Sequence, residues 1–279
     1  ADNKTRIYGD ANPALTYTVT GYVNGEGAST HSGSATLATT AGLTSNVGNV
    51  AITAAANNLT SSNYSFSYAN GTMAITPAAL TVTGANTSVI YTGLAQTNGV
   101  ATVSGLKNSD SFTISGYGTG SNYSATAYAD TLLATQASGT LASNYNISYT
   151  NGGLSIGKAN ATVTANSANV TYTGLAQSVS GFTATGLLNG QTTAVLSGVT
   201  ASGATGTNVA TYTNTVTGTD SNYNLTLVNG SLVIGKAGLV VTADNKTRIY
   251  GDANPALTYT VTGYVNGEGA STHSGLATL

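Results

Sequence analysis

Apolar and polar residues alternate along three short stretches, each of which continues on both sides of an Asn-Gly pair. The stretches open with Asn63-Tyr64, Asn144-Tyr145 and Asn222-Tyr223, and the pairs are Asn70-Gly71, Asn151-Gly152 and Asn229-Gly230. A period of two places successive side chains on opposite faces of a β-strand. Because Asn and Gly tolerate the positive φ angles of a type I′ turn, each stretch predicts a β-hairpin.

A second repeated element, a strand that leads to a tyrosine-containing turn, precedes each of these stretches. Residues 80–83, 161–164 and 240–242 lead to Tyr91-Thr92-Gly93, Tyr172-Thr173-Gly174 and Tyr250-Gly251-Asp252. Tyr8-Gly9-Asp10 is the same turn without a preceding strand. Further alternating runs at 16–20, 111–115 and 211–217 are rich in Thr, Val, Ile and aromatic residues, and they predict additional strands.

The pattern as a whole predicts an all-β fold. No long stretch carries the 3.6-residue apolar period of an amphipathic helix, although a short helical turn is possible near residues 105–107 or 186–188. We therefore expect modules with about five to seven short strands each. An immunoglobulin-like sandwich and a grasp-type sheet with one helical turn both fit this pattern, and the sequence leaves the choice open.

The repeats divide the chain into modules of about 80 residues. The predicted modules are 1–76, which lacks its first strand, then 77–157 and 158–235, and then 236–279, the truncated start of a fourth. Residues 243–279 repeat residues 1–37 with one difference, Leu276 in place of Ser34. A fixed period of this kind is typical of arrays.

The joints between modules are very short. They read Thr76-Pro77-Ala78, Gly157-Lys158-Ala159 and Gly235-Lys236-Ala237. A flexible Gly/Ser linker would let neighbouring modules tumble, whereas a joint of a few residues restricts bending. The sequence therefore predicts a tandem array that forms a rod.

Composition narrows the possible partners. Only 6% of residues are charged and the net charge is -2, against roughly 25% charged residues in ordinary soluble proteins. The chain has no basic stripe for nucleic acid and no polybasic patch for an anionic membrane. It has no cysteine, so packing and strand pairing must hold the modules together. Neither an apolar run of about 18 residues nor a signal peptide is found.

Catalytic chemistry has few candidate residues. The two histidines, His31 and His273, occupy the same repeat position. Asp10 and Ser29 could formally accompany His31 as an acid and a nucleophile. The surrounding Ser-Thr-His-Ser-Gly segment is more typical of an exposed loop. We assign no catalytic residue and expect no enzyme activity.

Metal ions and covalent crosslinks also have weak candidates. Asp10, Asn12 and Glu26 could meet across loops around Ca²⁺, but Asp and Asn in such segments more often stabilise turns. Lys158 and Lys236 could form Lys–Asn isopeptide bonds. Neither has an acidic neighbour in sequence, so we expect solvated lysines that protect strand ends from unwanted pairing. We expect no metal and no cofactor.

Two motifs resemble a known family. The Tyr-Gly-Asp-Ala-Asn-Pro-Ala-Leu stretches at 8–15 and 250–257 resemble the MBG domain of the YGX type. The Tyr-Thr-Gly-Leu-Ala-Gln stretches at 91–96 and 172–177 are similar to related MBG/YDG repeats. The resemblance covers essentially the whole chain. It implies a large bacterial exoprotein, such as a filamentous-haemagglutinin-like adhesin, at the cell surface or secreted, without catalysis, and it supplies no ligand residues.

Three functions fit these observations. The leading hypothesis is a structural stalk or spacer of a bacterial surface or secreted adhesin, whose partners are neighbouring modules of the same chain. The second is a self-associating extracellular filament, because residues 236–242 supply the strand that the first module lacks. Residues 236–279 would then be poorly ordered or completed by another chain, unless a covalent neighbour completes them. The third is a set of glycan- or host-protein-binding modules that present Tyr rings and Asn amides.

Overall fold

The structure is a computed structural model that describes all residues from Ala1 to Leu279. Its chain forms two compact units, which we describe separately. The first contains Ala1–Val89, Gln96–Gly120 and Ser124–Ser155, and the second contains Ile90–Ala95, Ser121–Tyr123 and Ile156–Leu279. This division does not test the module boundaries, which stay predictions. We keep the names first to fourth module for residues 1–76, 77–157, 158–235 and 236–279.

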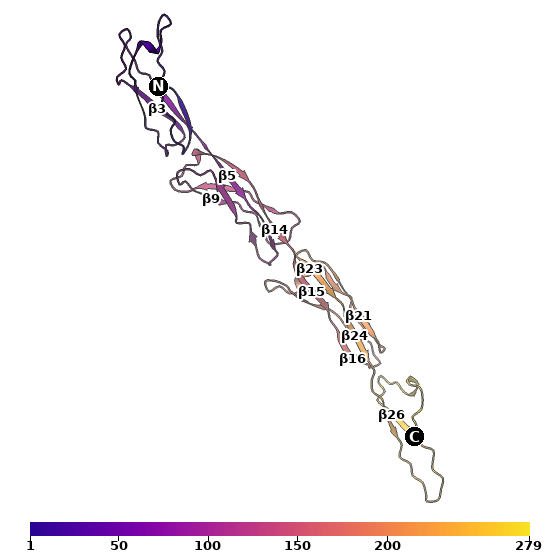
Figure 1. Ribbon diagram of the computed structural model, residues 1–279. Helices are drawn as coiled ribbons and strands as arrows, with labels where there is room; N and C mark the ends of the chain where they lie inside the picture. Colours follow the sequence, from indigo (N-terminus) through magenta and orange to yellow (C-terminus); the bar gives the residue numbers. More distant parts are fainter. The chain divides into compact units, whose positions relative to one another are not determined.

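The all-β fold class is confirmed. Strands occur along the whole chain and the helical residues form four single 3₁₀ turns, Ala28–Thr30, Ala142–Asn144, Thr193–Val195 and Ala270–Thr272 (Figure 1). The helical turns suggested near residues 105–107 and 186–188 are wrong. Each of these segments leads into a tight turn in which Asn108 or Asn189 has a φ of 52°, and a left-handed residue cannot continue a right-handed helix. The chain contains no helix that could span a membrane.

The first module contains one four-stranded sheet. Its strands are β1 (Lys4–Ile7), β2 (Thr36–Thr39), β3 (Gly48–Ala55) and β4 (Gly71–Thr76), in the spatial order β1-β4-β3-β2. β1 runs parallel to β4, and the other neighbours are antiparallel. The run predicted as a strand at 16–20 has no strand pairing.

The second module contains two three-stranded sheets. In the first, β5 (Ala78–Gly84) lies between β13 (Tyr145–Thr150) and β8 (Ala101–Ser104). In the second, β14 (Gly153–Gly157) lies between β11 (Tyr128–Ala129) and β6 (Asn86–Ile90). Two further pairs join β7 (Gln96–Thr97) to β10 (Thr119–Gly120) and β9 (Phe112–Ser115) to β12 (Leu133–Gln136).

The third module repeats this plan. β15 (Ala159–Ala165) lies between β18 (Phe182–Thr185) and β23 (Tyr223–Val228), and β24 (Gly230–Gly235) lies between β16 (Ala168–Thr171) and β21 (Thr211–Asn214). The additional pairs are β17 (Gln177–Val179) with β20 (Ala204–Gly206) and β19 (Val199–Ala201) with β22 (Val216–Gly218). Each of these two modules thus has two separate three-stranded sheets and no α-helix, as the immunoglobulin-like sandwich alternative requires. The fourth module has one strand pair, β25 (Val240–Ala243) with β26 (Tyr259–Thr262).

The predicted Asn-Gly hairpins are wrong. The strands on either side of Asn151-Gly152 belong to different sheets, because β13 pairs with β5 and β14 pairs with β11 and β6. The strands beside Asn229-Gly230 part in the same way, and in the first module residues 64–69 form no strand at all. The Asn-Gly pair therefore marks a crossing between sheets. Alternation identified five of the six strand segments beside the Asn-Gly pairs, but it did not identify their partners.

The Asn-Gly residues have a different structural role from the one predicted. Gly152 does not have a positive φ. A Cβ atom added there would lie 2.2 Å from the backbone oxygen of Ala85, so glycine is needed for a close backbone approach. The Asn151 side-chain oxygen accepts a hydrogen bond from the backbone N–H of Leu132 at 3.2 Å. The pair thus ties the crossing to neighbouring segments.

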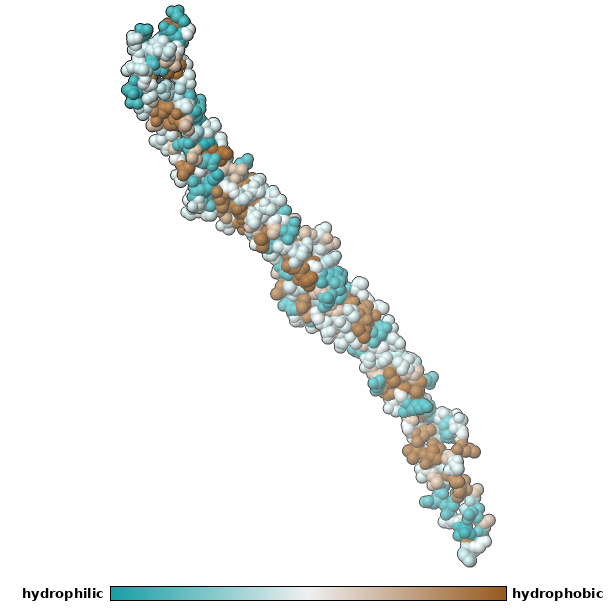
Figure 2. All heavy atoms as spheres, viewed as in Figure 1, coloured by the Kyte–Doolittle hydropathy of each residue, from teal (hydrophilic) through white to brown (hydrophobic).

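Small aliphatic residues fill the cores. On the central strand β5, Ala78, Leu80 and Val82 are buried while the residues between them are not. The alternating runs that follow the Asn-Gly pairs are confirmed as core strands, since the apolar residues at every second position are buried: Met73, Ile75, Leu154, Ile156, Leu232 and Ile234. Burying each such side chain contributes about 1.5–3 kcal/mol. The viewed surface is mostly near-neutral in hydropathy (Figure 2), in keeping with a chain of only 6% charged residues.

One carboxylate is buried within the second module. Asp130 is 1% exposed and accepts hydrogen bonds from the Asn98 side-chain amide at 2.8 Å and the Gly118 N–H at 2.7 Å. The Gly152 N–H donates a third, at 3.2 Å. Hydrogen bonds of this kind offset the cost of burying a charge. Asn214, which is fully buried in the third module, likewise bonds to backbone groups.

We expect Gly152→Ala to lower the free energy of unfolding by about 1–3 kcal/mol, because the new Cβ would overlap the Ala85 backbone oxygen. Gly42→Ala is the matched control. Gly42 has no positive φ and no atom within 4 Å of an added Cβ, so its effect should stay within about 0.5 kcal/mol. Urea unfolding followed by circular dichroism measures both. Equal effects of the two substitutions would contradict the close-approach explanation.

Candidate functional site

The residues considered for catalysis do not form a site. His31 Nδ1 lies 2.8 Å from the Tyr22 hydroxyl oxygen, and the two rings stack. Asp10 instead pairs with Lys107, and Ser29 is exposed. In the fourth module His273 repeats the contact with Tyr264 at 3.0 Å. The histidines therefore support local loop structure.

The residues considered for calcium are also engaged separately. The Asn12 side-chain amide donates to the backbone oxygen of Ala41 at 2.7 Å, and Glu26 accepts a hydrogen bond from the Tyr64 hydroxyl. No group of three or more His, Cys, Asp or Glu residues is arranged to hold a metal ion.

Lys158 is not the solvated lysine that the sequence predicts. Its Nζ donates to the backbone oxygen of Asp220 at 2.7 Å and lies 5.1 Å from the centre of the Tyr123 ring. The Asp220 carboxylate is occupied with the backbone N–H groups of Asn222 and Tyr223. The lysine therefore binds a carbonyl and an aromatic ring, which is a packing role.

The structure gathers instead residues that the sequence marked only as turns. Tyr8 lies in the Tyr-Gly-Asp turn of the first module, yet it is only 4% exposed. Its hydroxyl donates to Asp110 Oδ2 at 3.0 Å, and Tyr145 donates to the same oxygen at 2.6 Å. The two tyrosine rings meet edge to face with centroids 5.6 Å apart. Such pairs contribute about 0.5–1.5 kcal/mol beyond their area burial.

A lysine and a glycine complete this contact. Lys107 Nζ lies 2.8 Å from Asp10 Oδ1. Gly9 has a φ of +80°, and a Cβ added there would lie 2.6 Å from Lys107 Cβ, so the lysine stem packs directly on the turn. Because both side chains are partly exposed, the ion pair contributes at most about 1 kcal/mol. The close packing of the Lys107 stem on Gly9 instead favours a turn that has glycine at this position.

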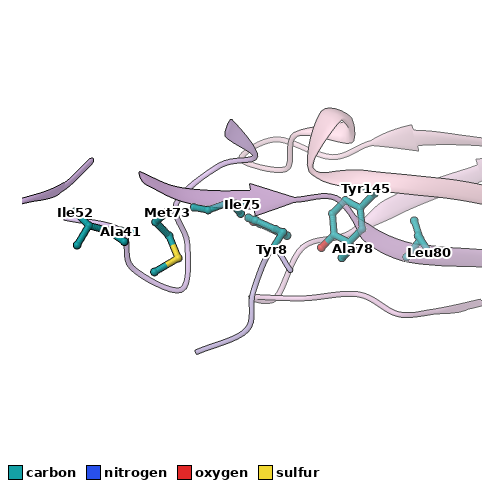
Figure 3. Packing of buried hydrophobic residues seen from close by; sticks show 8 residues of the cluster. All are labelled: Tyr8, Ala41, Ile52, Met73, Ile75, Ala78, Leu80 and Tyr145. Atoms are coloured by element: carbon teal, nitrogen blue, oxygen red, sulfur yellow. The ribbon is translucent and has the colours of Figure 1, made fainter. Parts of the chain in front are cut away.

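A continuous apolar core passes through the same joint. β4 and β5 are separated only by Pro77, so their buried side chains form one cluster across it (Figure 3). The cluster consists of Tyr8, Ala41, Ile52, Met73, Ile75, Ala78, Leu80 and Tyr145. The first two modules therefore share a core inside the first unit.

The second unit repeats the tyrosine contact. Tyr91 is 5% exposed, and its ring meets Tyr223 edge to face at 5.4 Å. The Gln191 amide donates to the Tyr91 hydroxyl at 2.7 Å and accepts from the Tyr223 hydroxyl at 2.6 Å. Asn189 donates to the backbone oxygen of Gly93 at 3.2 Å. Gln191 thus takes the place that Asp110 has in the first unit.

A third instance lies between the third and fourth modules, also within the second unit. The Tyr172 hydroxyl donates to the Glu268 carboxylate, and the Asn266 amide donates to the backbone oxygen of Gly174 at 2.9 Å. A Cβ added at Gly174 would lie 2.5 Å from Asn266 Cβ. No second tyrosine joins this contact, and Tyr172 is only half-buried.

These contacts define a repeated docking site. We call Tyr8, Tyr91, Tyr172 and Tyr250 the docking tyrosines, and the turns 23–26, 107–110, 188–191 and 265–268 the acceptor turns. In each acceptor turn the backbone N–H of the last residue bonds to the first, and an asparagine has a φ of 50–52°. The last residue is Glu26, Asp110, Gln191 or Glu268. Each turn therefore presents one carboxylate or amide.

Two components of the repeated site are not engaged in the structure. Tyr250 is fully exposed, at 101%. The acceptor turn at 23–26 binds Tyr64 through Glu26, but it receives no docking tyrosine. Tyr64 is accordingly half-buried, whereas Tyr145 and Tyr223 are 6% and 2% exposed. The tyrosine beside the acceptor turn is therefore more deeply buried where a docking tyrosine packs against it, as at Tyr145 and Tyr223, than where none does, as at Tyr64.

We expect stability to fall at high pH through Tyr145. Burial, and then the hydrogen bond to Asp110, raises the pKa of Tyr145 from 10.0 to about 12. The neutral hydroxyl therefore stabilises the fold fully below pH 10 and loses its contribution as the pH rises through about 12. Denaturant unfolding from pH 9 to 12 should show a steeper loss in the native chain than in Tyr145→Phe. Parallel curves would contradict this assignment.

Comparison with known proteins identifies the family of the repeated unit. No curated protein matches the chain. The family model of the MBG domain (YGX type) matches residues 1–74, 161–233 and 239–279, which is more than half of the chain. Residues 75–160 fall outside the match, although the second module has the same strand plan as the third. The resemblance in the Tyr-Gly-Asp motifs is confirmed: the chain belongs to the MBG domain family of the YGX type.

Proposed function

We propose that the chain is a structural stalk or spacer segment of a bacterial cell-surface or secreted adhesin and that it performs no catalysis. One observation carries the proposal: the same docking contact recurs three times, at Tyr8, Tyr91 and Tyr172. A binding or catalytic module needs one site, whereas a spacer needs the same joint repeated.

Two attachments at each of the first two joints favour a stiff connection. The first is the main chain, which passes from β4 to β5 across Pro77 alone and from β14 to β15 across Lys158 alone. The second is the docking tyrosine, which anchors on an acceptor turn away from that strand. A single attachment leaves a hinge, and a second one at a distance from it resists both bending and twisting.

The family and the composition support a surface location. MBG modules are repeat units of surface proteins, and the family is not a known enzyme family. The absence of cysteine means that the fold needs no oxidising step after export. The hydrogen-bonding partners of both histidines are tyrosines, which supports a role in loop structure.

We expect small-angle X-ray scattering of the chain to fit modules at fixed spacings. The double variant Tyr8→Ala, Tyr91→Ala should become more flexible, because each substitution removes a buried docking tyrosine. Tyr250→Ala is the matched control, since Tyr250 is fully exposed and should leave the profile unchanged. Circular dichroism checks that the variants stay folded. A native profile of freely moving beads would overturn the spacer proposal.

The surface location has its own test. Antibodies against this segment should label intact bacteria that produce the full protein, and protease treatment of intact cells should remove the label. Labelling that requires lysis would contradict the location while leaving the joint mechanics intact. A glycan array that shows strong, selective binding would favour the recognition alternative over the spacer.

A further inference from the structure

The docking turns of the three joints belong to two sequence classes. The first class is Tyr8-Gly9-Asp10, and the second comprises Tyr91-Thr92-Gly93 and Tyr172-Thr173-Gly174. The glycine therefore stands one residue after the docking tyrosine in the first class and two residues after it in the second. All three glycines have a positive φ, between 74° and 80°. The left-handed point of the turn thus moves with the glycine.

This shift changes which residue of the acceptor turn lies against the glycine. A Cβ atom added at Gly9 would lie 2.6 Å from the Cβ atom of Lys107, the first residue of its acceptor turn. A Cβ atom added at Gly93 would lie 2.9 Å from the Cβ atom of Asn189, the second residue of its acceptor turn. Gly174 repeats the second arrangement. The two classes of turn therefore pack on different residues of the acceptor turn.

The asparagine of the acceptor turn binds a different segment in the two classes. In the Tyr-Thr-Gly class its side-chain amide donates to the backbone oxygen of the docking glycine, at 3.2 Å for Asn189 and 2.9 Å for Asn266. Asn108 donates instead to the backbone oxygen of Leu43, at 3.0 Å, which lies outside the docking turn. A Tyr-Thr-Gly turn at this joint would therefore lack a hydrogen bond that its class makes at the other two.

Only the Tyr-Gly-Asp class brings a charge to the joint. Asp10 Oδ1 lies 2.8 Å from Lys107 Nζ. The corresponding first residues of the other two acceptor turns are Leu188 and Val265. A Tyr-Gly-Asp turn on either of those would place its carboxylate beside an aliphatic side chain. The charge would then lose its partner, which disfavours the mismatched contact.

The other contacts of the first two joints are alike and do not distinguish the classes. In both, the docking tyrosine meets a second tyrosine edge to face, as Figure 3 shows for the first joint. Asn144, which is 1% exposed, accepts a hydrogen bond from the Val47 N–H at 2.9 Å. Its copy Asn222 accepts one from the Tyr123 N–H at 2.9 Å. These contacts strengthen a joint without selecting between turn classes.

We propose that the docking turn and the acceptor turn form a recognition pair that determines which modules can be neighbours. A Tyr-Gly-Asp turn fits an acceptor turn that begins with lysine, and a Tyr-Thr-Gly turn fits one that begins with an aliphatic residue. The partner of each docking turn is therefore a module of the matching class. The inference goes beyond the proposed function, because this pairing rule holds whether or not the array serves as a spacer.

A pairing rule has a use in a chain of similar modules. The second and third modules have the same strand plan, so a docking turn can meet more than one acceptor turn while the chain folds. Specificity arises from the difference in free energy between the right and the wrong contact. Overlap at a Cβ position and an unpaired carboxylate both raise the free energy of the wrong one. The rule therefore protects adjacent joints from an exchange of partners.

Hydrogen exchange followed by mass spectrometry reads each joint separately. The Lys107 N–H donates to the Tyr145 hydroxyl at 3.0 Å, and the Leu188 N–H donates to the Tyr223 hydroxyl at 2.9 Å. Both hydroxyls belong to tyrosines that the docking contact covers, so opening of a joint exposes the amide to solvent. Peptides that contain these two amides therefore report on the first and the second joint of the same chain.

Exchange of the turn class at the first joint tests the rule. The variant Gly9→Thr, Asp10→Gly gives this joint a docking turn of the second class. A threonine Cβ at the first of these positions would overlap the Lys107 stem, and its backbone would be strained at a φ of +80°. We expect the exchange rate of the Lys107 peptide to rise about tenfold or more, while the Leu188 peptide keeps its native rate.

A compensating change of the acceptor turn completes the test. The variant Lys107→Leu, Ser109→Gly, Asp110→Gln gives residues 107–110 the sequence of residues 188–191. Alone it should also speed exchange at the first joint, because it removes the cation beside Asp10. Combined with the changed docking turn, it should return the rate toward the native value, because turn and acceptor then belong to the same class.

Asn144→Ala is the matched control for weakening without a change of class. It removes a contact that both joints share, so it should speed exchange at the first joint, and the changed acceptor turn should not rescue it. Circular dichroism checks that every variant is folded. A changed docking turn without effect, or a combined variant that exchanges as fast as the single ones, would refute the pairing rule. Neither result bears on the spacer proposal, which scattering of the joint variants decides separately.

Discussion

Tyr8 is almost completely buried although it lies in a turn, because the second module places Tyr145 and Asp110 around it. The burial of Tyr8 by residues of the neighbouring module is the constraint on which the rest of the structure depends. A module of about 80 residues is only marginally stabilised by the surface that it buries by itself, and this chain has no cysteine and one partly exposed ion pair, between Lys107 and Asp10. The side chains that complete each core must therefore come partly from the neighbouring module. The shared cluster around Pro77 is the direct result.

Coupling of this kind makes stability a property of pairs of modules, as in other repeat proteins. The docking tyrosine, the second tyrosine and the carboxylate or amide of the acceptor turn form a small network in which each member orients the others. Asp110 accepts from two hydroxyls, whereas Gln191 donates to one and accepts from another. The network thus tolerates a change from acid to amide while keeping its geometry. This tolerance explains how neighbouring modules differ in sequence yet repeat the same contact.

The sequence predicted many of the strands but few of their partners, and the alternating runs at 16–20 and 64–69 form no strand. Alternation identified β14 and β24 as core strands, and repetition identified the tyrosine turns. The Asn-Gly hairpins were wrong because a glycine can serve a close backbone approach as well as a turn, and only the backbone around Gly152 distinguishes the two. The docking site was missed because its parts lie far apart in sequence. One signal was present: an acid or amide recurs two residues after Asn24, Asn108, Asn189 and Asn266.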